Sequence, residues 1–222
     1  MKNAIIVFIV IALIGFGAYF LFRGPEKAGV TTDTTQQPEE SEQTGEAQDA
    51  GQGKEGESVI GKSVQGREIT AYHYGNGDAE IIFVGGMHGG YSWNTALVAY
   101  ETMDYLEANP GAIPGSVRVT VVPVLNPDGL NKVVGVAGRF AKADVPSSQE
   151  LRISGRFNAN NVDLNRNFDC DWQSTGKWQN TTVSGGSETF SEPESSAIRD
   201  YIKARKPAAV VVFYSAAGGV FA

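Results

Sequence analysis

Three stretches of very different composition divide the 222-residue sequence, and only the last of them can fold into a globular domain. Residues 4–22 form an apolar run without a charge or a proline. Residues 24–57 carry nine acidic and two basic side chains and no aromatic one, so they cannot bury enough apolar surface to offset their chain entropy. The remaining residues, 58–222, are nearly neutral, with 16 acidic and 14 basic side chains, and their number suits one domain.

The apolar run has nearly the length of a membrane-spanning helix. Its 19 residues, at about 1.5 Å of rise each, almost cross a hydrocarbon core of roughly 30 Å. A cleaved signal peptide is the alternative, but its apolar part has about 7–15 residues and ends at small side chains, whereas this run ends in bulky Tyr19–Phe22. We therefore expect residues 1–23 to form an uncleaved membrane anchor, one transmembrane helix with its N-terminus inside. Residues 24–57 would be a disordered acidic linker, and the protein a single-pass membrane protein with an extracytoplasmic domain.

Composition also excludes several classes of function. One cysteine cannot form an internal disulfide or a cysteine-based zinc cage, and the net charge of −7 argues against a nucleic-acid partner, which would need a basic face. Residues 56–63 fit the phosphate-binding pattern GxxxxGK[ST]. That pattern works only between a buried strand and a helix, whereas here the acidic segment precedes it and a strand-like alternation follows it. We therefore expect no nucleotide partner.

Strand patterns recur along residues 58–222. Residues 68–74 alternate with period two, and residues 80–84 and 118–125 are short, mostly apolar runs typical of central strands. The apolar run 208–213 is typical of a strand buried on both faces. Because helical patterns separate these strands, the sequence predicts an α/β fold with helices covering a sheet.

Two helices are expected between the strands. The first has an apolar face made of Ala96, Ala99, Tyr100, Met103 and Leu106. It should end at Asn109-Pro110-Gly111. The second should begin at Ser191, where Glu194 three residues later would complete a capping box. Residues 126–190 are expected to be mostly loop, and a loop of that length in a compact domain is usually functional.

Polar residues gather after the strands and in the long loop, where α/β proteins build their sites. His88 follows the second strand and lies between two pairs of glycines, which let a backbone or a ligand approach closely. A strong turn signal, Asn126-Pro127-Asp128-Gly129, follows the third strand. Arg156, Asn165 and Arg166 come later. An arginine fork suits a carboxylate and Asn adds a neutral donor, although a surface ion pair is the commoner role of any single arginine.

Taken together, these segments resemble the zinc metallocarboxypeptidase family, including its bacterial members that cleave peptidoglycan peptides. The likeness runs from residue 60 to residue 222. The segments that carry it, in the family's order, are Ile60–Arg67, Gly85–Gly90, Asn126–Gly129, Gly155–Asn158, Val162–Phe168 and Phe190–Glu194. The resemblance implies a mixed, mostly parallel sheet sandwiched by helices, in agreement with the α/β pattern.

The resemblance also implies a zinc ion held by a His, by a Glu three or four residues later and by a second His after a later strand. His88 matches the first ligand. Ser92 stands where the Glu is expected, just before Trp93, and Tyr214 stands where the second His is expected. Ser and neutral Tyr are poor substitutes, since zinc prefers imidazole, thiolate or carboxylate, so we expect impaired zinc binding. The other histidine, His73, lies inside the first strand pattern and is expected to be structural.

By the same resemblance, Asn165 and Arg166 would bind the terminal carboxylate of a peptide. Arg156 would be the catalytic group that polarises the scissile carbonyl and stabilises the oxyanion. The family's general base, a Glu on a still later strand, finds no counterpart in this sequence. We therefore expect residues 58–222 to form a partial, truncated domain of a pseudoenzyme.

The sequence leaves three hypotheses open. In the first, the chain is a membrane-anchored, impaired or partial member of a family that hydrolyses C-terminal peptide bonds, with a peptide or a peptidoglycan stem peptide as substrate. In the second, it is a non-catalytic module that retains Asn165, Arg166 and Arg156 to bind peptide C-terminal carboxylates. In the third, it is a decayed gene product without a function.

Overall fold

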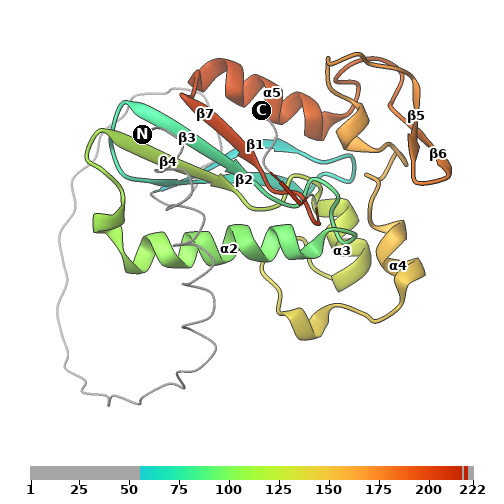
Figure 1. The fold of residues 1–222 in the computed structure, drawn as a ribbon, viewed down its shortest axis with the longest axis horizontal. Helices are drawn as coiled ribbons and strands as arrows, with labels where there is room; N and C mark the ends of the chain where they lie inside the picture. The colour runs from blue at the N-terminus through green and yellow to red at the C-terminus, as the bar shows by residue number, and fades with distance from the viewer. Residues whose placement is uncertain (1–55, 217, 220–222) are drawn as a thin grey trace, which may run out of the picture. The chain divides into compact units, whose positions relative to one another are not determined.

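A five-stranded mixed sheet is the frame of the part of the chain that the structure describes. The structure is a computed structural model that describes residues 56–216 and 218–219 (Figure 1). The strands, in the order β1-β2-β4-β3-β7, are Glu57–Lys62 (β1), Glu68–Tyr74 (β2), Val117–Val122 (β4), Ala79–Val84 (β3) and Ala209–Val212 (β7). β3 runs parallel to both of its neighbours, whereas β2 runs antiparallel to both of its own. The expected mixed sheet is confirmed, but only the half built on β3 is parallel.

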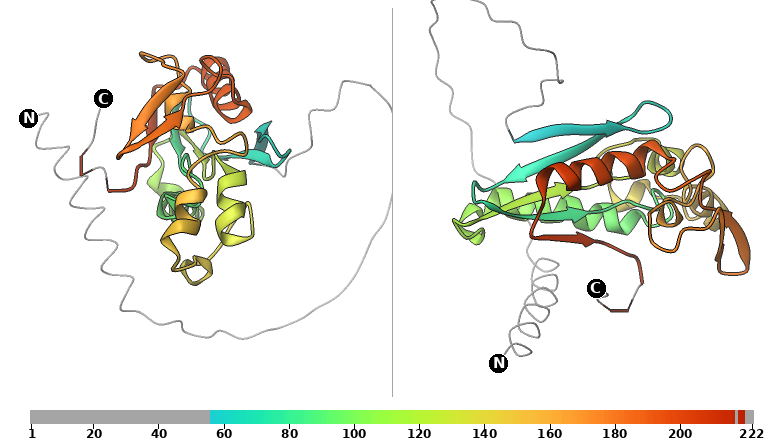
Figure 2. Two further views of the ribbon diagram at one scale, coloured as in Figure 1. Left: turned by 90° about the vertical axis from the view of Figure 1, so that its right-hand side faces the viewer. Right: turned by 90° about the horizontal axis from the view of Figure 1, so that it is seen from above.

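Two helices cover opposite faces of this sheet (Figure 2). α2, Trp93–Ala108, packs its predicted apolar face against Val119 and Val121 of β4. α5, Pro193–Arg205, packs against the other face, which includes Val122 of β4. Successive side chains of a strand point to opposite faces, so β4 serves both hydrophobic layers at once. The prediction of an α/β fold with helices on a sheet is confirmed.

The segment from residue 126 to residue 190 is mostly irregular, as predicted, but it contains four short helices and strands. Its helices and strands are α3 (Pro127–Val134), α4 (Gln149–Ser154), β5 (Thr175–Trp178) and β6 (Thr181–Ser184). Short 3₁₀ turns occupy Pro110–Ala112 (η1), Lys142–Asp144 (η2) and Leu164–Arg166 (η3). Side-chain caps start the two helices: Asn126 accepts a hydrogen bond from the Gly129 amide, and Ser148 accepts one from the Leu151 amide. Elements this short carry too little hydrophobic periodicity to be seen in a sequence.

Two expectations are wrong in detail. The last apolar run forms β7, but Val210 is 38% and Val211 is 39% exposed, because β7 is the edge of the described sheet and pairs only with β3. α5 begins at Pro193 without the predicted capping box. The Ser191 hydroxyl donates to the neighbouring Glu192 side chain instead of accepting a backbone N–H at the start of the helix.

The phosphate-binding pattern at residues 56–63 lies in β1 and the turn that leads to β2, and the next element is that strand rather than a helix. The predicted anchor at residues 4–22, and nearly all of the predicted acidic linker, lie outside the described residues. Among the residues that are described, no helix combines the length and the apolar character needed to cross a bilayer.

Three backbone segments approach one another so closely that only glycine fits at their contacts. They are the loop after β3, the first turn of α3 and the end of α4. A Cβ atom on Gly129 would lie 2.4 Å from the carbonyl oxygen of Gly155, and a Cβ on Gly89 would lie 2.7 Å from the same oxygen. Gly89 also has a φ of +43°, which side chains rarely adopt. These contacts fix the loop that carries His88 against the segment that carries Arg156.

Replacing Gly129 with Ala should lower the free energy of unfolding by about 1–3 kcal/mol, because the new methyl group cannot avoid a backbone oxygen. Denaturant unfolding of the full chain, followed by tryptophan fluorescence, measures the change. Gly111→Ala is the matched control, since nothing lies within 4 Å of a Cβ atom at that position. Equal stability of the two variants would contradict the close-packing argument.

Candidate functional site

His88 lies in the loop after β3, and its side chain is buried, with the residue 6% exposed. The Nε2 atom of His88 lies 3.3 Å from Oδ1 of Asp163, yet no aligned hydrogen bond satisfies this buried nitrogen within the described part of the chain. Burial lowers the pKa of His88 and outweighs the opposing effect of Asp163. The imidazole is therefore neutral at pH 7.

Asp163 joins His88 to Arg156. Its carboxylate is fully buried, and Oδ2 accepts hydrogen bonds from Nε and Nη2 of Arg156 at 3.1 and 2.8 Å. Burial alone would raise the pKa of Asp163, but the contact with His88 and the positive charge of Arg156 outweigh it and hold that pKa below its usual value. One ionised carboxylate thus links two of the predicted site residues.

Aromatic rings enclose the guanidinium group of Arg156. Its Cζ atom lies 4.5 Å from the ring centre of Trp178 and 5.4 Å from that of Tyr91. Stacking and the ion pair with Asp163 together hold this planar group in one orientation. Arg156 is therefore a buried, neutralised cation, and its role in polarising a substrate carbonyl stays a prediction.

Tyr214 follows β7 and packs its ring edge-to-face against His88, with the two ring centroids 6.0 Å apart. Its hydroxyl donates a hydrogen bond to Oδ1 of Asn165 at 2.6 Å and lies 3.2 Å from Sδ of Met87. Tyr214, which stands in place of the second histidine, therefore contacts His88, the predicted first zinc ligand. It also contacts Asn165, one of the two residues predicted to bind the peptide carboxylate.

Asn165 and Arg166 both belong to the 3₁₀ turn η3, which the Asp163 side chain caps by accepting a hydrogen bond from the Asn165 amide. Arg166 is exposed, and its Nη2 atom donates to the backbone carbonyl of Lys177 on β5 at 2.9 Å. No carboxylate among the described residues pairs with Arg166. The structure thus brings Asn165 and Arg166 together at the edge of the buried His88–Asp163–Arg156 group.

Ser92 precedes α2 and is also buried, with 4% of the residue exposed. Its carbonyl, not its hydroxyl, accepts hydrogen bonds from the amide and the hydroxyl of Thr95. The other histidine, His73, lies on β2, where its ring nitrogens bond with the hydroxyls of Ser58 and Thr120. This is the structural role predicted for it.

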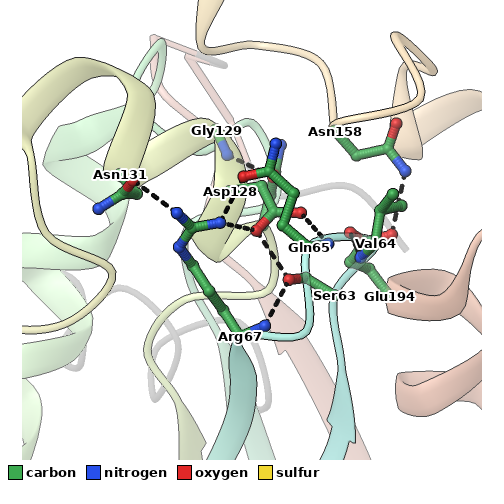
Figure 3. A network of polar contacts seen from close by, with 10 residues as sticks. Ser63, Val64, Gln65, Arg67, Asp128, Gly129, Asn131, Asn158 and Glu194 are labelled. Atoms are coloured by element: carbon green, nitrogen blue, oxygen red, sulfur yellow. Dashed lines mark hydrogen bonds and ion pairs between the residues drawn. The ribbon is translucent and has the colours of Figure 1, made fainter.

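A polar network fastens the turn after β1 to α3 and α5 (Figure 3). Asp128, at the start of α3, accepts hydrogen bonds from three groups of that turn: the Ser63 hydroxyl at 2.7 Å, the Gln65 amide at 3.0 Å and Nη1 of Arg67 at 2.7 Å. Glu194, on α5, accepts hydrogen bonds from the Val64 amide at 3.1 Å and from Nδ2 of Asn158 at 3.0 Å. Because Asn158 lies two residues after Arg156, the network also restrains the segment that carries this arginine.

The sequence model of the family described as zinc carboxypeptidase matches residues 57–221, about three quarters of the chain. The chain belongs to the zinc carboxypeptidase family. The resemblance predicted from six short segments is thereby confirmed, and those segments supply the glycine contacts, the polar network and the buried ion pair described above.

Curated relatives of this zinc carboxypeptidase chain include bacterial and mammalian enzymes. Gamma-D-glutamyl-L-diamino acid endopeptidase 1 of Lysinibacillus sphaericus is 27% identical over 175 residues, which cover 70% of this chain and 44% of that protein. Carboxypeptidase M of Mus musculus is 31% identical over 157 residues, which cover 65% of this chain and 30% of that protein. The chain therefore spans less than half the length of either relative.

Solved structures share the fold. Carboxypeptidase A from Helicoverpa armigera matches with a TM-score of 0.53 and 24% identity, over 72% of this chain and 40% of that one. Bovine thrombin-activatable fibrinolysis inhibitor, solved with a tick carboxypeptidase inhibitor, matches with a TM-score of 0.55 and 18% identity, over 72% of this chain and 53% of that one. These likenesses agree with the α/β fold that the sequence predicts.

The family name implies a zinc ion, but the donor set of the described residues does not fit one. His88 is a good zinc ligand, whereas Ser92 and Tyr214 offer hydroxyl groups. The described part of the chain holds no group of three or more His, Cys, Asp and Glu side chains that could bind a metal ion. Asp163 approaches His88, but it is already paired with Arg156.

Sequence reasoning missed the role of Asp163. The residue lies inside the segment Val162–Phe168 that carried the family resemblance. A sequence pattern, however, does not reveal whether an Asp is buried or which residue it contacts. One signal was available, because a metal-binding histidine usually donates its second ring N–H to a carboxylate, a backbone carbonyl or a water. Applied to His88, this rule points to an acidic residue within the matching segments.

Asp163→Asn should lower the free energy of unfolding by about 3 kcal/mol, because the substitution leaves the charge of Arg156 buried without a counter-ion. Chemical denaturation of the full chain at pH 7 measures the loss. Asp200→Asn is the matched control: Asp200 pairs with Arg199 on the solvent-exposed face of α5, and we expect no measurable change. Equal effects of the two substitutions would contradict the burial argument.

The same pair predicts a pH dependence. The pKa of Asp163 is lowered in the folded protein, so its stabilising contribution is complete above the unfolded pKa of about 3.9 and is lost as the pH falls through the folded value. The stability difference between wild type and Asp163→Asn should therefore be constant near neutral pH and shrink in acid. A difference that grew as the pH fell would show that Asp163 is not held ionised.

Proposed function

We propose that this zinc carboxypeptidase-family domain binds peptides through a free C-terminal carboxylate and does not hydrolyse the peptide bond. The observation that carries the proposal is the hydrogen bond from Tyr214 to Asn165. Tyr214 stands at the sequence position expected for the second zinc-binding histidine, and its hydroxyl donates a hydrogen bond to the side-chain oxygen of Asn165. The amide nitrogen of Asn165 and the guanidinium of Arg166 are the donors left for a carboxylate.

The charge balance of the site supports this proposal. Asp163 neutralises Arg156, and burial keeps His88 neutral, so the buried centre carries little net charge. Arg166, in contrast, has no carboxylate partner among the described residues and lies exposed on η3. A peptide carboxylate would therefore be attracted to Arg166, which lies on the turn that Asp163 caps.

The relatives support a peptide as the ligand class. One is named for a bond between a γ-D-glutamyl residue and an L-diamino acid, and others are named carboxypeptidases. We propose a peptide, or a cell-wall stem peptide, as the ligand of this chain. With residues 1–23 as a membrane anchor and residues 24–57 as a linker, the domain would act outside the cytoplasm as part of a single-pass membrane protein.

Binding should depend on a free C-terminus. The full chain, kept in detergent micelles because of its apolar N-terminal run, is titrated with one peptide in two forms, with a free and with an amidated C-terminus. The free form should bind about tenfold more tightly, since charge-assisted hydrogen bonds to Asn165 and Arg166 are lost with the amide. Arg166→Gln should remove this preference, whereas Arg199→Gln, at a residue of α5 that pairs with Asp200, should keep it. Equal affinities of the two peptide forms for wild type would disprove the proposal.

Hydrolysis of the C-terminal peptide bond is the second candidate, and the family match favours it. It requires a zinc site that Ser92 and Tyr214 do not complete. The full chain supplied with zinc should therefore release no C-terminal amino acid above a protein-free control containing zinc. Turnover by the wild-type chain that disappears in His88→Ala would establish hydrolysis and refute the non-catalytic proposal.

A further inference from the structure

A cavity of about 530 Å³ adjoins the candidate site. The loop after β3, the first turn of α2, helix α4 and the segment after β7 form its wall. The side chains that matter for its chemistry are Tyr91, Trp93, Asn94, Gln149, Arg152 and Ser215. Arg152 is the one charged residue among the described residues of this wall, so the cavity carries a positive charge.

Arg152 differs from most arginines of the domain in having no carboxylate partner among the residues that the structure describes. Those at positions 67, 139, 156, 199 and 205 each pair with a carboxylate. Within the described residues, no carboxylate lies within ion-pair distance of Arg152 or of Arg166. Arg166 lies on η3, and Arg152 lines the cavity.

Two paths of direct contact connect the cavity with the carboxylate-binding donors. Tyr91 lines the cavity and packs its ring edge-to-face on Trp178, with centroids 5.1 Å apart. The residue before Trp178 binds Arg166 through its carbonyl oxygen. On the other side, Ser215 lines the cavity and directly follows Tyr214, which binds Asn165. The cavity therefore lies next to the place proposed for the peptide C-terminus.

We propose that this cavity binds a second carboxylate of the peptide ligand, an inference that rests on the proposed function. Arg152 supplies the charge, the amides of Asn94 and Gln149 supply neutral donors, and the rings of Tyr91 and Trp93 add apolar surface. The ligand class is then a peptide with an acidic residue beside its C-terminal residue.

The second carboxylate has two chemical sources. In an ordinary peptide it is the side chain of Glu. In a γ-linked glutamyl residue the side chain forms the peptide bond, and the α-carboxylate is left free. Both sources present the same anionic group to Arg152, and they differ in the length of chain between that group and the C-terminal carboxylate.

The test uses four peptides of equal length, with Glu or Gln before the last residue and with a free or an amidated C-terminus. Calorimetric titration into the full chain in detergent micelles should show Glu peptides binding about five- to tenfold more tightly than Gln peptides in both C-terminal forms. Arg152→Gln should abolish this preference and keep the preference for a free C-terminus. Arg166→Gln should abolish the preference for a free C-terminus and keep the preference for Glu. Arg199→Gln should keep both preferences.

A fifth peptide, with γ-linked Glu and a free C-terminus, identifies the source of the carboxylate. Tighter binding of this peptide than of its α-linked counterpart assigns the cavity to the glutamyl α-carboxylate, and the opposite order assigns it to a side chain. Equal affinity of the Glu and Gln peptides would overturn the cavity proposal while leaving the C-terminal site intact. A Glu preference without a C-terminal preference would overturn the proposed function instead. Absence of binding by all five peptides would overturn both.

Discussion

The buried carboxylate of Asp163 is the group on which the rest of the site depends. One oxygen faces His88, the other binds the guanidinium of Arg156, and the same side chain caps the turn that carries Asn165 and Arg166. A carboxylate removed from water is costly unless its charge is compensated and its oxygens accept hydrogen bonds, and Arg156 and the Asn165 amide meet these needs. Removing the acid would therefore disturb the buried centre and the exposed donors together.

Backbone packing makes this arrangement possible. The segments that carry His88 and Arg156 come from opposite ends of a long stretch of chain, and Gly89, Gly129 and Gly155 let them meet without side chains between them. The network of Asp128 and Glu194 then fixes the neighbouring turn after β1. The site is thus held by short-range contacts between loops and by the side chains that α3 and α5 direct at them.

The sequence predicts the elements that have a strong hydrophobic period and misses those defined by tertiary contacts. β2 and the apolar face of α2 follow from period and apolar content alone, whereas α4 starts at a serine cap that resembles any loop serine. Motif order predicts which residues gather at the site. It does not predict that Tyr214 bonds to Asn165 or that Arg156 is buried, because both depend on partners that lie far away in the sequence.

Arginine side chains carry the positive charge of the candidate site. The described residues do not assemble a donor set for zinc, and the proposed donors to a peptide carboxylate are Asn165 and Arg166. Neither Arg166 nor Arg152 has a carboxylate partner among the described residues, on a domain that is nearly neutral as a whole. In the two proposals each of these arginines attracts one carboxylate, so a ligand with two carboxylates would be favoured over a ligand with one.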